Sequence, residues 1–182
     1  MISAQRLKLI PLALNHLKIG LHSINELSSA IRIPLILTLF DGDVQRAVSN
    51  KIEKMEKEPV ELHDWFTYWL IVIKDDNIGV GTVGFKGAPD SNGSVEIGYG
   101  LDEKFRCHGY MSEAVSEMLT WAFTHSNCDV VTATRVLKKN LGSQKVLHHN
   151  RFIVSSETEE YINYMLPKQD FTIYKLKKSI LT

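Results

Sequence analysis

The chain has 182 residues, of which 44% are apolar, and its 21 Lys and Arg residues balance its 21 Asp and Glu residues. This length and apolar content suit one domain with its own core, spanning residues 1–182. A formal net charge of zero argues against nucleic acid as a partner, because proteins that bind phosphate backbones usually carry a basic excess.

The N-terminal third of the chain predicts one strand and two helices. "RLKLIPL", Arg6–Leu12, is typical of a short strand that ends at a proline. Leu14–Leu27 predicts a helix, since its leucines and Ile24 recur on one face. Asp41–Glu58 predicts a second, highly charged helix, which opens on an acidic residue and stops at Pro59.

Three strands follow, separated by turn-forming residues. They are expected at Tyr68–Lys74, Ile78–Gly87 and Ser94–Leu101. Gly79, Gly81 and Gly84 in the second of them spell the dinucleotide-binding pattern G-x-G-x-x-G. That motif works only where a strand leads into a helix, so its place inside a β-branched strand argues against a nucleotide site.

A helix is predicted to begin near Gly109. Apolar residues recur after it at helical spacing through Tyr110, Met111, Ala114, Val115, Met118, Leu119, Ala122 and Phe123. The first turn of a helix leaves several N–H groups without partners, and these together with the helix dipole favour an anion such as a phosphate. Arg106 would add a positive charge beside them. On this stretch alone, a plain helix start with a surface arginine explains the pattern equally well.

The remaining elements alternate between strands and a helix. We expect a strand at Asp129–Val136, a helix at Asn140–His149, a strand at Arg151–Glu157 and a final strand, "DFTIYKL", at Asp170–Leu176. An antiparallel meander followed by strand–helix–strand predicts an α+β fold with one mixed, mostly antiparallel sheet flanked by helices.

No apolar run reaches the roughly 18–20 residues of a membrane span, and the basic residues near the N-terminus are scattered without a signal-peptide pattern. Cys107 and Cys128 provide neither a disulfide framework nor metal-ligand spacing. We therefore expect a cytoplasmic protein without a membrane partner or a metal.

"VEIGYGLDEKFRCHGYMSEA" and the later "VLKKNLGSQKVLHHNRF" resemble the GNAT superfamily of acyl-CoA-dependent N-acetyltransferases, and in particular the branch that includes ribosomal-protein N-terminal acetyltransferases. The family motif is Arg or Gln, two residues, Gly, one residue, then Gly or Ala, which falls here on Arg106, Gly109 and Met111. Met111 departs from this motif, and its line with Val115, Met118 and Ala122 favours a place in the core. The terminal segments also resemble the terminal strands of that branch.

The resemblance implies a site for acetyl-CoA as cosubstrate. The strand ending in Tyr99, Gly100 and Leu101 would pair with the pantetheine arm and splay from the strand that begins near Asp129. The N–H groups of the pyrophosphate loop would hold the pyrophosphate; this loop consists of Arg106, Cys107, His108, Gly109, Tyr110 and Met111. Asn140 would reach the pantetheine and Ser143 the sulfur. Asn140 also suits a plain helix N-cap, and Ser143 a tolerated polar helix residue.

In the reaction that this family catalyses, an amine attacks a thioester and loses a proton. The thiolate that leaves must then be protonated. Glu96 matches a position where many members of the branch carry an acid, so it is the candidate base; a solvent-facing strand residue is the alternative. Ser143 is the candidate proton donor. The acceptor amine could belong to a protein N-terminus or to a small molecule such as a polyamine or aminoglycoside. A non-catalytic acyl-CoA-binding module and a homodimer also stay open.

Overall fold

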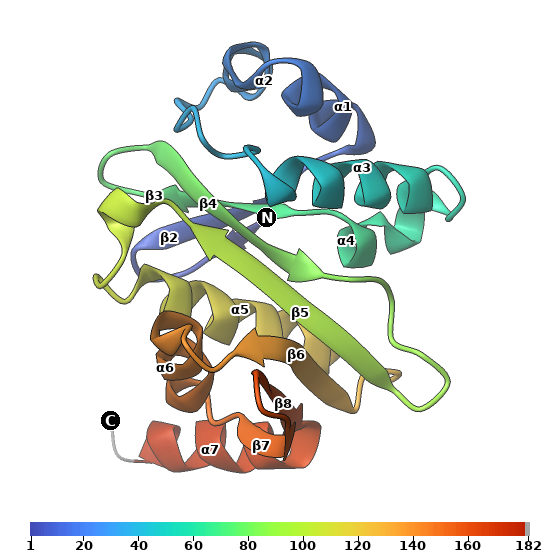
Figure 1. Cartoon of the computed structure of the whole chain (residues 1–182), viewed down its shortest axis with the longest axis vertical. Coiled ribbons are helices and arrows are strands. Elements are labelled where there is room, and N and C mark those ends of the chain that lie inside the picture. The colour runs from blue at the N-terminus through green and yellow to red at the C-terminus, as the bar shows by residue number, and fades with distance from the viewer. Residues whose placement is uncertain (181–182) are drawn as a thin grey trace.

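The computed structural model describes residues 1–180, apart from the side chains of residues 43, 175 and 177–180. One eight-stranded sheet forms its centre, with the order β1-β2-β3-β4-β5-β6-β8-β7 (Figure 1). The strands are β1 Ile2–Ser3, β2 Leu7–Pro11, β3 Trp69–Ile73, β4 Ile78–Phe85, β5 Ser94–Leu101, β6 Val130–Leu137, β7 Ile153–Glu157 and β8 Tyr161–Pro167. Only β5 and β6 are parallel among these neighbours, so the predicted α+β fold with a mixed, mostly antiparallel sheet is confirmed.

Helices cover both faces of this sheet, with α1 to α4 on one side and α5 and α6 on the other (Figure 1). Their bounds are α1 Leu14–His22, α2 Ile24–Ile31, α3 Asp43–Met55, α4 His63–Phe66, α5 Tyr110–Thr124, α6 Leu141–His149 and α7 Lys168–Ile180. Two 3-10 turns, η1 Val60–Leu62 and η2 Glu103–Phe105, join neighbouring elements. No helix within residues 1–180 is both long enough and apolar enough to cross a membrane.

Helix α5 is the helix predicted from Gly109 onward, and its apolar stripe is buried as expected. The buried residues are Met111, Ala114, Val115, Met118, Leu119, Ala122 and Phe123. The stripe faces β2, β4 and β5. Burial of this stripe fixes the rotation of α5, and so it fixes where the first turn of the helix lies relative to the end of β5.

The single helix predicted at Leu14–Leu27 is two helices. Ser23 has extended backbone between α1 and α2, and its hydroxyl accepts a hydrogen bond from the Glu26 N–H at 3.2 Å. Serine followed three residues later by glutamate is the sequence of a capping box, which favours a new helix start over continuation.

The strand predicted at Asp170–Leu176 is also wrong, because these residues lie within α7. Phe171 packs on Phe123 with ring centroids 5.3 Å apart, and the Arg151 guanidinium lies 4.9 Å from the centre of the Tyr174 ring. A spacing of three places Phe171 and Tyr174 on one helical face, so the apparent alternation of the sequence is a helical period. The last strand is β8, which the sequence pattern did not reveal.

Candidate active site

Strands β5 and β6, the one parallel pair among the described strands, form a fork. These strands pair at Ser94 with Val130, Val95 with Val131, and Glu96 with Thr132, and at no later position. Beyond Glu96, β5 continues along β4 to Leu101, while β6 continues along β8. Because the strands separate, the edge of β5 from Ile97 to Leu101 faces the fork with backbone groups that β6 does not pair.

The loop that leads into α5 presents a row of free N–H groups. Cys107 and Gly109 have positive φ angles of 64° and 80°, and Gly109 is the N-cap of the helix. In the described part of the chain, no N–H from Cys107 to Ser112 donates a hydrogen bond; the first helical bond runs from the Glu113 N–H to the Gly109 carbonyl at 3.1 Å. Successive free N–H groups at a helix start form a concave site suited to an anion.

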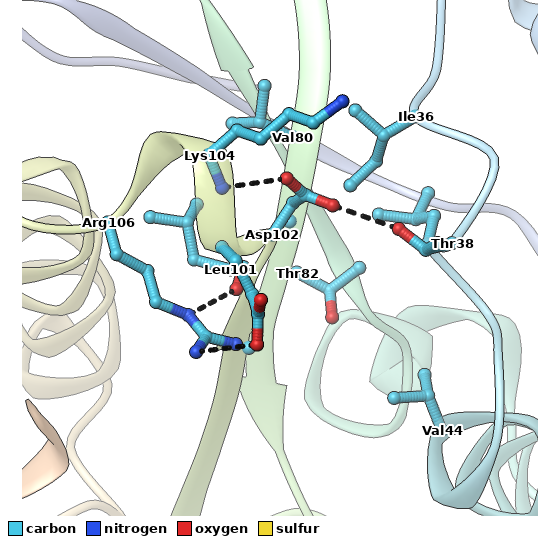
Figure 2. A pocket seen from close by; sticks show the side chains of 13 residues that line it. Ile36, Thr38, Val44, Val80, Thr82, Leu101, Asp102, Lys104 and Arg106 are labelled. Atoms are coloured by element: carbon cyan, nitrogen blue, oxygen red, sulfur yellow. Dashed lines mark hydrogen bonds and ion pairs between the residues drawn. The ribbon is translucent and has the colours of Figure 1, made fainter.

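Arg106 does not extend over these N–H groups. Its Nε donates to the Leu101 carbonyl at 3.1 Å, and its Nη1 donates to Glu103 Oε1 at 3.4 Å. Figure 2 shows this side chain turned back along the end of β5. Its backbone belongs to the loop that leads into α5, whereas its guanidinium contributes to a pocket beside that loop.

A different arginine, Arg6, contacts the loop that leads into α5. Arg6 lies just before β2, and its Nε donates to Glu113 Oε2 at 2.7 Å while its Nη1 donates to the His108 carbonyl at 2.9 Å. Sequence reasoning missed this residue, because no local pattern signals a contact between positions 107 residues apart.

Met111 points away from the loop and into the core. The residue is 7% exposed and belongs to the same buried cluster as Val115 and Met118. The departure from the family motif at this position therefore adds apolar packing, as its place in the helical stripe predicted.

Tyr99 and Ser143 meet across the fork. The Tyr99 hydroxyl donates to the backbone carbonyl of Ser143 at 3.3 Å. Burial raises the pKa of the Tyr99 phenol to about 12, and the nearby side chain of Ser143 acts in the opposite direction. The tyrosine therefore brings a protonated hydroxyl to the fork. The family resemblance implies a role only for the backbone of Tyr99.

Asn140 caps α6 as its sequence context suggested. Its Oδ1 accepts a hydrogen bond from the Ser143 N–H at 3.1 Å. This bond fixes the first turn of α6, which carries Ser143, beside the edge of β5.

Glu96 lies at the point where β5 and β6 separate. Its Oε1 accepts hydrogen bonds from Lys86 Nζ at 2.6 Å and from the Thr134 hydroxyl at 2.7 Å, and its side chain is 23% exposed. Alternation along β5 places Glu96 on the face opposite Tyr99, as expected. Gly98 and Gly100 follow on the same face as Glu96, and a Cβ at either glycine would meet nothing within 4 Å.

A pocket of about 490 Å³ lies between the end of β5 and the loop that joins α2 to α3 (Figure 2). Asp102 ties that loop to the strand, because its Oδ2 accepts a hydrogen bond from the Thr38 hydroxyl at 2.9 Å. The pocket is lined by Ile36, Thr38, Leu39, Val44, Val80, Gly81, Thr82, Gly100, Leu101, Asp102, Glu103, Lys104 and Arg106. Within the described residues, no three His, Cys, Asp or Glu side chains are grouped so that they could hold a metal ion.

Comparisons with known proteins identify the family and the fold. Residues 6–153 match the family model described as an acetyltransferase (GNAT) domain. A relative from Bacillus subtilis (strain 168), the uncharacterized N-acetyltransferase YjdG, is 39% identical over 100 residues, which are 55% of this chain and 59% of that protein. The chain thus spans little more than half the length of this relative.

Two solved structures share the fold. One is RimL, a ribosomal L7/L12 α-N-protein acetyltransferase in complex with coenzyme A, with a TM-score of 0.63, 18% identity, and coverage of 93% of this chain and 98% of that one. The other is a mutant form of the spermidine/spermine N-acetyltransferase SpeG from Vibrio cholerae, with a TM-score of 0.64, 12% identity, and coverage of 93% and 98%. With the family model matching most of its length, the chain belongs to the GNAT acetyltransferase family.

Proposed function

We propose that the protein transfers the acetyl group of acetyl-CoA to a primary amine. The observation that carries this proposal is the fork between β5 and β6 with a row of free N–H groups, Cys107 to Ser112, at its mouth. A ligand that pairs with a strand edge and ends in a pyrophosphate would satisfy both features. Pantetheine, which carries two amides, and the pyrophosphate of coenzyme A have this chemistry.

The cosubstrate would occupy the fork as an additional strand. The backbone of Tyr99, Gly100 and Leu101 would pair with the pantetheine amides, and the pyrophosphate loop, Arg106 to Met111, would hold the phosphates. Asn140 and Ser143 would border the thioester end. The absence of a side chain at Gly109 lets the backbone approach the phosphates closely.

In the reaction, the amine nitrogen forms the new C–N bond to the acetyl carbonyl carbon and the C–S bond breaks. The extra proton of the amine passes to Glu96, directly or through water, and Glu96 then releases it to solvent. The departing thiolate receives a proton through Ser143, whose hydroxyl regains one from solvent, so both residues return to their starting states. Glu96 suits this role because it faces the open strip above Gly98 and Gly100, through which an acceptor could approach. Tyr99 is a second candidate donor, since its hydroxyl lies within hydrogen-bonding distance of Ser143.

Two classes of acceptor fit this chemistry, and the pocket lining favours the protein N-terminus slightly. A polyamine would call for a strongly acidic site, whereas the pocket lining pairs Asp102 and Glu103 with Lys104 and Arg106. An α-amine with a pKa of about 7.7–8 is also partly neutral near pH 7, whereas an alkyl amine near 10.4 is almost fully protonated. We therefore place a protein or peptide α-amine first and a small-molecule amine second.

Release of free thiol from acetyl-CoA tests the proposal. The acceptor panel contains peptides with free and with blocked N-termini, spermidine and an aminoglycoside. We expect thiol release with free N-terminal peptides and none with the blocked peptides. Release with spermidine alone would favour the second acceptor class, and binding of CoA without turnover on any amine would favour a non-catalytic acyl-CoA-binding module.

A further inference from the structure

Arg6 joins the N-terminal segment to the first turn of α5. Its backbone N–H donates to Glu113 Oε1 at 2.7 Å, and its Nε donates to Glu113 Oε2 at 2.7 Å. Both carboxylate oxygens of Glu113 are thus bound by one residue. The Glu113 side chain is only 15% exposed, so this ion pair is partly shielded from water.

The same guanidinium fixes the peptide that precedes Gly109. Its Nη1 donates to the His108 carbonyl at 2.9 Å. In a trans peptide the carbonyl and the following N–H point in opposite directions. A bond that holds the His108 carbonyl toward Arg6 therefore turns the Gly109 N–H away from Arg6, and that N–H is one of the free donors of the pyrophosphate loop.

Charge gives Arg6 a second effect. Glu113 lies near the start of α5, where a carboxylate is favoured by the helix dipole but repels a phosphate that binds there. The Arg6 guanidinium balances this negative charge at contact distance. Its Nη2 reaches beside Gly109, 3.3 Å from the point where a Cβ would stand, and 44% of the Arg6 side chain remains exposed.

Aromatic rings support this placement of Arg6. Its Cζ lies 4.8 Å from the centre of the Tyr110 ring, and the Tyr110 ring stacks with that of His108 at 5.8 Å. A guanidinium over an aromatic face is held in one orientation. In the described residues no acceptor is bonded to Nη2, so one edge of the guanidinium stays free at the rim of the loop.

We propose that Arg6 is the positioning residue of the pyrophosphate loop: it orients the Gly109 N–H through the His108 carbonyl and cancels the charge of Glu113, so that a coenzyme A pyrophosphate can bind. This inference rests on the proposed function and adds to it a residue far from the family motif. Arg6 takes the place at this loop that the sequence had suggested for the Arg106 side chain.

A cycle of variants at Arg6 and Glu113 tests the inference, with CoA as the probe in calorimetry and melting temperature as the measure of folding. Arg6→Gln should weaken CoA binding by about tenfold, because it leaves the Glu113 charge unbalanced. Glu113→Gln breaks the same ion pair but keeps the positive charge, so its binding should stay within about threefold of wild type. In the double variant, Glu113→Gln should recover part of the affinity lost in Arg6→Gln, because it restores the charge balance but not the hydrogen bond to the His108 carbonyl.

The outcomes separate this inference from the proposed function. If wild type does not bind CoA, the proposed function fails. If wild type binds and Arg6→Gln binds equally well, Arg6 has no role at the loop. Equal losses in Arg6→Gln and Glu113→Gln without recovery in the double variant would mean that the ion pair only holds the fold, which also overturns the inference.

Two further variants complete the test. Arg46→Gln removes an exposed arginine from α3 and should leave CoA affinity unchanged, which controls for net charge. Should Arg6→Gln not fold, Arg6→Lys keeps the charge and loses the planar fork that reaches both Glu113 and His108. Arg6→Lys should then bind CoA more weakly than wild type, and equal binding would contradict the proposal.

Discussion

At the scale of single residues, Ser143 and Tyr99 are the two hydroxyl-bearing residues that meet across the fork, where we propose that the thioester lies. Because burial keeps the pKa of Tyr99 near 12, its phenol stays protonated at neutral pH and could donate. We expect Ser143→Ala to lower kcat by at least about tenfold, or ~1.4 kcal/mol, with little change in KM for acetyl-CoA. Tyr99→Phe is the matched comparison, and a larger loss of kcat in Tyr99→Phe than in Ser143→Ala would assign the donor to the tyrosine.

Glu96 gives a prediction at the same scale. Glu96→Gln keeps the shape of the side chain and removes the base, so the rate should fall most at low pH, where the acceptor amine is protonated. The defect should shrink as pH rises, because the free amine then loses its proton without help. The pH–rate profiles of both enzymes report this. A variant whose rate and profile match those of wild type would rule out Glu96 as the base.

At the scale of elements, helix α5 was predictable and helix α7 was not. The α5 pattern is complete on one face, and the residues between its apolar positions are polar, so only a helical period fits. The sequence of Asp170–Leu176 is compatible both with a strand and with a helix. Contacts with Phe123 and Arg151, which are distant in sequence, favour the helix. Local patterns cannot contain such contacts, and for the same reason they did not reveal Arg6 beside α5.

Helix α3 carries a buried lysine with a measurable consequence. Lys51 is 8% exposed, and its ammonium donates to the carbonyls of Phe66, Thr67 and Phe85. Burial, followed by the charges of Lys54 and Lys86, lowers its pKa to about 7. No ion pair to Lys51 is found among the described residues.

The sign of the pH effect follows from this lowered pKa. Between about pH 7 and 10.4 the unfolded chain holds the Lys51 proton and the folded chain does not, so the contribution of Lys51 to stability rises with pH over this range. Below about pH 7 both states are protonated and its contribution is constant. In denaturant unfolding, the free energy of unfolding of wild type relative to that of Lys51→Met should therefore increase by up to about 1.4 kcal/mol per pH unit above pH 7. Parallel stability curves would contradict this, and Lys57→Met, at an exposed position after α3, is the control.

At the scale of the whole molecule, the main feature is the fork between β5 and β6. Resemblance to the family predicted that the strand ending at Leu101 would diverge from the next one, and the register confirms that pairing stops after Glu96. The sequence could not place the pocket beside Asp102, because its walls come from the α2–α3 loop, α3, β4 and β5. A pocket of this kind forms only once the chain has folded, so no local motif in the sequence could reveal it.

The central claim is that coenzyme A binds in this fork with its pyrophosphate on the N–H groups before α5. Calorimetric titration with CoA tests it most directly, in a comparison of wild type with Gly109→Val and Gly42→Val. Gly42 is the control because its backbone φ is also positive, at 58°, but it lies before α3. A β-branched residue suits neither backbone, but only Gly109→Val would block the approach of the phosphates. We expect micromolar binding by wild type and Gly42→Val, and at least about tenfold weaker binding by Gly109→Val. No binding by wild type, or equal binding by folded Gly109→Val, would contradict the account.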